Sequence, residues 1–449
     1  MEHWKTVLEN LAIRALNSKL EKPAPQIPTN LNYLGLTVPD GEAFEISSAD
    51  LARHAYILGA TGCGKTSLIL KLIEQDIRNG KSIAVIDLRG DLIAGAIGIC
   101  ANLQIPFDRV KLLDLREPKR VAGFNPLSGP GEAHIRALHV LDVLQSESES
   151  WGVQLEESLR NALLLLTEAK APLTALERVF LDEAFRNSLL RQCTDDSVTG
   201  FWSRYAALSE DRQQAWALPV LNKVTPLMAA RALRESLGSE SPIDLRATLS
   251  KPGQILLVSL AVDELHRSGR MLGSLVVSSI SREMMSRVNV PEKNRNPVRL
   301  YVDEFENMAS DSFEGLIAEG RRFGLTLVLS HQTLTQLPPK LRSVIRNNVG
   351  LQMLFQCGYE DARQLARELP PELESYSLRA LEVGQAFVMD RTGKARLIQF
   401  NPPPKPAPKL IHATYRESLL KRLPPNRVQK STSTQTPSKS QITGLEDWA

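Results

Sequence analysis

The chain has 449 residues, of which 43% are hydrophobic, so it can form one large domain with a subdomain and a tail. A net charge of +3 neither favours nor excludes a nucleic-acid partner, and the four cysteines show no C-x-x-C pair and no zinc-like spacing. Because no run approaches the roughly 18 apolar residues that span a bilayer, we expect a soluble, cytoplasmic protein without a transmembrane segment.

Residues 1–50 are predicted to form an N-terminal arm and linker. An amphipathic helical pattern begins near Trp4, and a proline-rich stretch follows at Pro23, Pro25 and Pro28. The ordinary interpretation is an arm that packs against the body of the protein or against a neighbouring subunit. Contact with a membrane surface is the alternative.

An octapeptide at 59–66 fits the phosphate-binding loop pattern G-x-x-x-x-G-K-[ST] at every fixed position. It lies between a short apolar run at 55–58 and a helical pattern at 67–77, which is the setting that such a loop requires. Glycines let successive N–H groups face one concavity, and the following helix adds its positive end. A glycine-rich structural turn is the alternative. We predict that ATP is bound by the loop residues Gly59, Ala60, Thr61, Gly62, Cys63, Gly64, Lys65 and Thr66.

Two residues of this loop carry specific roles. Lys65 would contact the β- and γ-phosphates, and the Thr66 hydroxyl would bind Mg²⁺. The expected cofactors are therefore ATP and Mg²⁺.

The next segments predict a parallel sheet with a helical insertion. Apolar runs at 82–87 and 110–115 are typical of strands buried on both faces, and strand patterns return only after residue 250. Residues 131–249 show helical periodicity instead, with turns expected at Ala171-Pro172 and Leu218-Pro219. The later strands are expected at 254–260, 298–305, 325–330, 349–355 and 385–390.

These patterns predict an α/β fold with a doubly wound, mostly parallel sheet. The nucleotide-binding domain would comprise residues 51–130 and 250–400, and an all-helical domain of residues 131–249 would be inserted into it. Residues 401–449 are rich in proline at the start, then in Ser, Thr, Gln and Lys, and carry eight basic against three acidic residues. We expect a disordered basic tail that either contacts nucleic acid or is only a solvated linker, with a candidate docking peptide at 445–449.

The strand pattern at 298–304 ends in two carboxylates. Asp303 is placed to bind Mg²⁺, and Glu304 is placed to polarise the attacking water. A switch that only binds nucleotide needs the first acid more than the second, so the pair indicates hydrolysis. An ordinary capped strand end is the alternative.

A third group of candidates surrounds the strand pattern at 325–330. Gln332, beyond its end, is predicted to sense the γ-phosphate and the attacking water through its amide. Arg321 is the candidate arginine finger, acting on the site of an adjacent subunit. The neighbouring Arg322 could serve instead, and either arginine could be a surface salt-bridge residue. We assign His331 to packing or capping rather than to chemistry.

In their order and spacing, the motifs resemble the FtsK/HerA superfamily. Within it the likeness is greatest to the conjugative coupling proteins of type IV secretion (TraG/TraD-like), in a soluble form without membrane helices, and it covers roughly residues 50–400. The segments that carry the resemblance are 53–66, 84–92, 124–127, 301–305, 320–324 and 330–332.

This resemblance implies a RecA-like P-loop NTPase that assembles as a ring, with a homohexamer expected, and pumps DNA through a central channel. By motif position, Lys65 and Thr66 would contact phosphate and magnesium, and Asp87 and Asp91 match a recurring second-strand motif beside the site. Asp303 would be the metal ligand and Glu304 the base that activates water. Gln332 would be the sensor, and Arg321 the arginine finger. The membrane helices and barrel-forming segment with which coupling proteins normally begin are not recognisable here.

Three interpretations therefore compete. The first is a DNA-translocating ATPase, acting on single- or double-stranded DNA. The second is an ATP-dependent docking or assembly ATPase that switches a protein partner, through the helical domain or the C-terminal tail, without moving DNA. The third, a small-molecule kinase, is weaker because no acceptor site or lid is evident and Glu304 suits water better than a second substrate.

Overall fold

The computed structural model describes residues 31–423, except 39, 118, 309–310 and 367–374. The amphipathic N-terminal pattern with its proline-rich stretch and the candidate docking peptide lie outside the described residues. The centre of the fold is one eleven-stranded sheet in the order β2-β1-β11-β10-β9-β3-β8-β7-β4-β6-β5. Within the described part of the chain, no helix is both long and apolar enough to cross a membrane.

The larger part of the sheet is parallel, as the sequence predicts. All residues of its strands at 55–58, 82–87 and 255–259 are buried, which explains their continuous apolar runs. From one side to the other the parallel strands are β9 (Leu351–Phe355), β3 (Ala55–Leu58), β8 (Leu325–His331), β7 (Val298–Asp303), β4 (Ser82–Asp87), β6 (Ile255–Ser259) and β5 (Val110–Asp114).

Helices cover both faces of this sheet, so the core has two halves. Because successive strand residues point to opposite faces, Ile83 and Val85 join one half while Ala84 and Ile86 join the other. The helices that contribute to the first half are α3 (Lys65–Arg78), α4 (Asp91–Asn102) and α19 (Lys409–Lys421). Those that contribute to the second half are α14 (Arg267–Met285), α15 (Asp311–Glu319) and α16 (Pro339–Asn348).

Four antiparallel strands extend the sheet beyond β9. They are β10 (Gln385–Asp390), β11 (Ala395–Phe400), β1 (Leu31–Thr37) and β2 (Ala43–Ser47). The expectation that residues 1–50 form only an arm and linker is therefore wrong for residues 31–47. At Gly35 a Cβ would lie 2.1 Å from the Gln399 carbonyl oxygen, so only glycine allows the close approach of β1 to β11.

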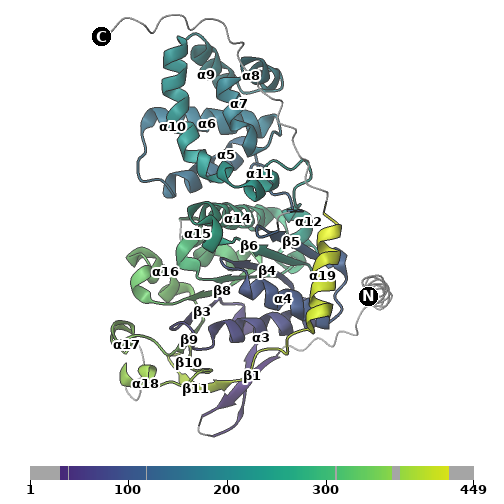
Figure 1. The fold of residues 1–449 in the computed structure, drawn as a ribbon. Helices are drawn as coiled ribbons and strands as arrows, with labels where there is room; N and C mark the ends of the chain where they lie inside the picture. Colours follow the sequence, from purple (N-terminus) through teal and green to yellow (C-terminus); the bar gives the residue numbers. More distant parts are fainter. Residues whose placement is uncertain (1–30, 39, 118, 309–310, 367–374, 424–449) are drawn as a thin grey trace, which may run out of the picture.

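Residues 133–250 form a lobe of helices on the α14 side of the sheet (Figure 1). Aromatic side chains of Phe180, Phe201, Trp202 and Tyr205 pack edge to face within it. The helices are α5 (Ala133–Ser146), α6 (Val153–Glu168), α7 (Leu176–Leu181), α8 (Glu183–Leu190), α9 (Asp196–Ala206), α10 (Glu210–Ala229), α11 (Arg231–Leu237) and α12 (Leu245–Ser250).

One predicted turn in this lobe is wrong. Helix α10 continues through both Pro219 and Pro226, although each ring removes one backbone donor. The helix packs against α6, α7, α11 and α14, so tertiary contacts outweigh the local helix-breaking preference. Shorter helices connect the remaining elements: α2 (Ser48–Leu51), α13 (Val262–Leu265), α17 (Tyr359–Leu365) and α18 (Ser375–Arg379).

The predicted disordered tail contains one ordered helix. Helix α19 lies against α4 and β5 (Figure 1), so the prediction is wrong for residues 409–421. Tyr415 is fully buried there, and its hydroxyl donates to the Ile105 carbonyl oxygen at 2.6 Å. The sequence hides this docking because only Tyr415, Leu419 and Leu420 of the helix are buried.

Candidate nucleotide-binding and hydrolysis site

The loop at 59–66 joins β3 to α3, as its motif predicts. Gly62 and Gly64 have φ values of 82° and 113°, which residues with a Cβ rarely adopt. A Cβ at Gly59 would lie 2.5 Å from the Phe355 Cβ. No side chain caps the first turn of α3, so the backbone N–H groups at the start of that helix are available to an anion.

Lys65 folds back over this loop. Its buried Nζ donates to the Gly59 carbonyl oxygen at 2.6 Å and to the Ala60 carbonyl oxygen at 2.9 Å. The ammonium is thereby held beside the concavity that the loop backbone forms. Thr66 follows as the second residue of α3, which is where a magnesium-binding hydroxyl is required. The loop therefore fits a nucleotide polyphosphate.

Neighbouring strands hold the loop in this shape. The Ala60 N–H donates to the Gln356 carbonyl oxygen at 2.7 Å, and the Gly384 N–H donates to the Cys63 carbonyl oxygen at 2.9 Å. The Cys63 side chain is buried beneath the loop, and burial raises the pKa of its thiol. Cys63 thus contributes packing and a backbone acceptor rather than a thiolate.

Asp303 lies at the same edge of the sheet as the loop. β8 separates β7 from β3, and the register pairs Asp303 with Ser330 and His331 with Leu58. Two strand spacings put the ends of β3 and β7 about 10 Å apart. Burial raises the pKa of Asp303, the Asp87 carboxylate adds to this effect, and the Lys65 ammonium opposes it. A carboxylate facing a lysine in this way fits the second protein ligand of a Mg²⁺ ion bound to phosphate.

Glu304 and Gln332 are in direct contact. Gln332 Nε2 donates to Glu304 Oε1 at 2.7 Å, and Gln332 Oε1 accepts from the Thr61 hydroxyl at 3.2 Å. The backbone of Glu304 has a φ of 52°, a left-handed conformation that is uncommon outside glycine. The phosphate-binding loop, the candidate sensor and the candidate base therefore form one hydrogen-bonded chain.

Arg321 is not part of this cluster. It lies in a 3₁₀ turn (Gly320–Phe323) that precedes β8, whereas the loop follows the carboxyl end of β3. The seven residues of β8 separate the two edges by about 20 Å. Burial lowers the pKa of His54, at the amino end of β3, to about 4, and the nearby charge of Arg321 contributes to the decrease. Arg321 and Arg322 are both exposed in this turn, at the opposite edge of the sheet from the loop.

His331 belongs to the core between these elements. It is fully buried, contacts the Tyr56 hydroxyl and packs edge to face on Phe305. Burial lowers its pKa to about 3, so the ring is neutral at physiological pH. A neutral, enclosed imidazole suits the packing role assigned from the sequence.

Sequence reasoning left the role of Asp87 and Asp91 open and did not single out Arg89 or Glu306. Asp87 caps helix α4 by accepting from the Leu92 N–H at 2.7 Å, so its role is structural, while Asp91 is exposed in the first turn. Arg89 Nη2 lies 3.3 Å from Glu304 Oε1. Burial, with help from Glu304 and Asp303, raises the pKa of Glu306 to about 7. The position of Arg89 just after a strand adjacent to β7 is the signal that could have found it.

Comparison with known proteins identifies the fold through solved structures. No protein-family model and no curated protein matches the sequence. Among solved structures, the unbound bacterial conjugative coupling protein TrwBΔN70 superposes with a TM-score of 0.59 at 15% identity, over 87% of this chain and 92% of that one. The structure of TrwB in complex with ADP and Mg²⁺ superposes with a TM-score of 0.59 at 15% identity, over 87% of this chain and 94% of that one.

VirB4 of Thermoanaerobacter pseudethanolicus gives a TM-score of 0.57 at 13% identity, over 85% of this chain and 99% of that one. These likenesses extend over nearly the whole length of both partners. The predicted fold class and the resemblance in fold to conjugative coupling proteins are thereby confirmed: the chain has the α/β, RecA-like P-loop fold of the coupling protein TrwB and of VirB4.

Proposed function

We propose that the chain is an ATPase that hydrolyses ATP to move DNA, as a ring of subunits. The observation that carries the proposal is the hydrogen-bonded chain from Thr61 through Gln332 to Glu304. It connects the loop that binds phosphate to the carboxylate that would activate water. A protein that only bound nucleotide would not need this connection.

Each side chain has one task in the proposed reaction. Lys65 binds the β- and γ-phosphates, and Glu304 accepts the proton of the attacking water. Gln332 keeps the water and Glu304 in line, because its amide bonds to the carboxylate at 2.7 Å. Magnesium, held by Thr66 and Asp303, would neutralise charge that develops on the phosphates.

Two further arguments support ATP and the ring. TrwB, which shares this fold, has been solved with ADP and Mg²⁺ and with a non-hydrolysable ATP analogue. The exposed Arg321, about 20 Å from the loop of its own chain, can supply a finger only to a neighbouring subunit. DNA as the substrate and six as the subunit number rest on the resemblance to conjugative coupling proteins.

The first test is ATP turnover with and without single- or double-stranded DNA. We expect DNA to raise kcat, and the stimulation to fall steeply between low and moderate salt because phosphate contacts release counterions. Lys65→Ala should abolish nucleotide binding in a calorimetric titration. Turnover that no DNA changes at any salt concentration would refute the DNA motor and favour an ATPase that docks a protein partner.

The second test addresses the shared interface. Arg321→Ala should bind nucleotide normally but not hydrolyse it, whereas Arg322→Ala, the matched neighbour, should retain turnover. Mixing Arg321→Ala with Glu304→Gln should restore activity, because some interfaces then combine an intact finger with an intact base. Full activity of the wild-type protein as a dilute monomer would exclude a finger supplied by another subunit.

A further inference from the structure

The segment Asp87-Leu88-Arg89-Gly90-Asp91 begins at the last residue of β4, and the proposed reaction gives it no task. Its backbone is nevertheless held firmly. The Asp87 carboxylate accepts from the Arg89 N–H at 3.0 Å as well as from two N–H groups at the start of α4. Gly90 has a φ of 97°, and a Cβ there would lie 3.0 Å from the Ser259 hydroxyl oxygen. A residue with a Cβ would therefore strain the turn at this position.

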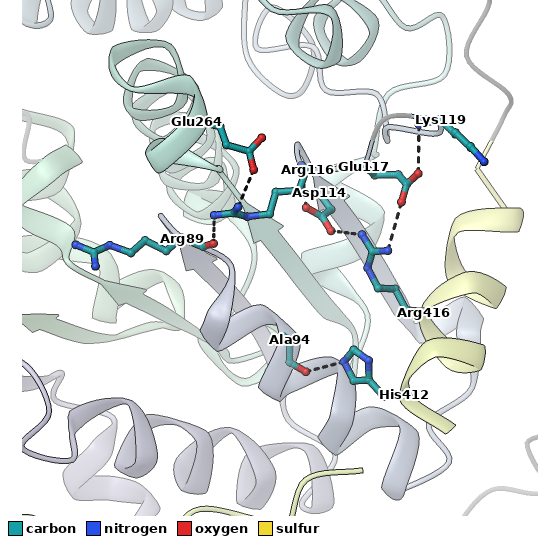
Figure 2. Close-up of polar contacts among 9 residues, drawn as sticks. All are labelled: Arg89, Ala94, Asp114, Arg116, Glu117, Lys119, Glu264, His412 and Arg416. Carbon is teal, nitrogen blue, oxygen red and sulfur yellow. Dashed lines mark hydrogen bonds and ion pairs between the residues drawn. The ribbon is translucent and has the colours of Figure 1, made fainter. Parts of the chain in front are cut away.

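The other side of the Arg89 peptide is held by a second arginine. Arg116 donates to the Arg89 carbonyl oxygen, and the same guanidinium pairs with Glu264 of α13 (Figure 2). It also pairs with Asp263 of the same helix. The side chain of Arg89 points away from Arg116 in this view. With its N–H and its carbonyl both bound, Arg89 has a fixed backbone and a side chain that is 61% exposed.

This side chain meets Glu304 on one particular oxygen. Arg89 Nη2 lies 3.3 Å from Oε1, the atom that also accepts from Gln332 Nε2 at 2.7 Å. Within the described residues, Oε2 receives neither a hydrogen bond nor an ion pair. One oxygen of the carboxylate is thus held from two sides, by groups at the ends of β4 and β8, and the other is available to a water molecule.

We propose that Arg89 is a positioning residue for Glu304. Together with Gln332 it fixes Oε1, so that Oε2 is directed at the attacking water and takes its proton. The inference rests on the proposed hydrolysis of ATP and concerns the orientation of its base. Exposed ion pairs contribute little to stability. The contribution of Arg89 is expected in the rate instead, because misplacing a reacting group by about 1 Å can cost about 100-fold.

The test compares Arg89→Ala, Arg89→Lys and a matched control. Arg231 has the same side-chain exposure, 61%, and pairs at 2.6 Å with a glutamate that is 15% exposed, close to the 17% of Glu304, but lies on α11 in the helical lobe. We expect Arg89→Ala to lower kcat about 10- to 100-fold with an unchanged KM for ATP, Arg89→Lys to recover part of the loss, and Arg231→Ala to match the wild type.

A double variant shows whether Arg89 acts through Glu304. In single-turnover measurements, adding Arg89→Ala to Glu304→Gln should slow the reaction no further, because the group that Arg89 positions is already absent. An Arg89→Ala protein with wild-type kcat, or with a defect confined to KM, would overturn the inference while leaving ATP hydrolysis intact. A wild-type protein without any turnover would overturn both the inference and the proposed function.

Discussion

A buried ion pair connects the two halves of the candidate site and is its most testable structural feature. Asp76, near the end of the loop helix α3, is fully buried. Both of its oxygens accept from Arg299 Nη1 at 2.6 Å, and one accepts from the Tyr301 hydroxyl at 2.6 Å. Lys81 Nζ lies 3.3 Å from Asp76 Oδ1. Because Arg299 and Tyr301 belong to β7, this cluster fixes the helix that follows the loop to the strand that ends in Asp303.

The change to make is Asp76→Asn, which keeps the volume and removes the charge. Burial by itself would lower the pKa of Arg299, but Asp76 and then Tyr301 raise it above its ordinary value. In the variant the guanidinium loses its buried counter-ion, but it stays charged because arginine is not deprotonated in proteins. Removing one partner of a buried pair costs about 3–5 kcal/mol. Since domains are stable by only about 5–15 kcal/mol, the loss should be large.

The assay is urea unfolding followed by circular dichroism. Lys421→Gln serves as the control, because Lys421 pairs with Glu417 on the surface, where the two side chains are 60% and 58% exposed, and should cost less than about 1 kcal/mol. Arg299→Gln added to Asp76→Asn should cost clearly less than the sum of the single changes. A loss below about 1 kcal/mol for Asp76→Asn, or strict additivity, would refute the reasoning.

Three further predictions concern single buried or hydrogen-bonded side chains. Gln332→Ala should lower kcat about 100-fold with unchanged nucleotide affinity, because the Glu304 carboxylate loses the amide that donates to it at 2.7 Å. Steady-state kinetics with a binding titration would check this, and a change in affinity alone would contradict it. Burial lowers the pKa of His54 from 6.5 to about 4, so its neutral form stabilises the fold fully above pH 6.5 and less as the pH falls towards 4. Between pH 7 and 4, unfolding experiments should show the wild type losing about 3 kcal/mol more than His54→Asn, and parallel curves would contradict the assignment. Tyr415→Phe should cost about 1–2 kcal/mol in the same assay because the Ile105 carbonyl loses its donor, and an unchanged midpoint would mean that α19 is not docked.

The parts of the site that could be predicted from the sequence are those that the backbone itself demands. Gly62 and Gly64 must be glycine because the loop needs positive φ values, and Lys65 and Thr66 follow at fixed offsets. Asp303 and Gln332 are candidates from the sequence because each lies at the end of an apolar run, and the carboxyl ends of parallel strands meet at one edge of the sheet.

The parts that could not be predicted depend on contacts between distant segments. Asp76 and Arg299 are 223 residues apart, and nothing in either local sequence indicates that the two charges are buried together. The strand β1 contains Asn32 and Gly35, both poor strand formers, and is stabilised by pairing with β11 near the other end of the chain. In such segments tertiary pairing decides the structure, and local preference does not.

The positions of Arg89 and Arg321 at opposite edges of the sheet give the two arginines different parts in the proposed reaction. Arg89 reaches Glu304 within the chain and is held by contacts that need no second subunit, so it can orient the base before a ring forms. Arg321 lies at the opposite edge of the sheet, and in the proposed ring it would act on a neighbouring subunit. Orientation of the base would then belong to each subunit, while stabilisation of the transition state would depend on assembly. Turnover would consequently be limited to the assembled ring, although every chain carries a complete nucleotide-binding loop.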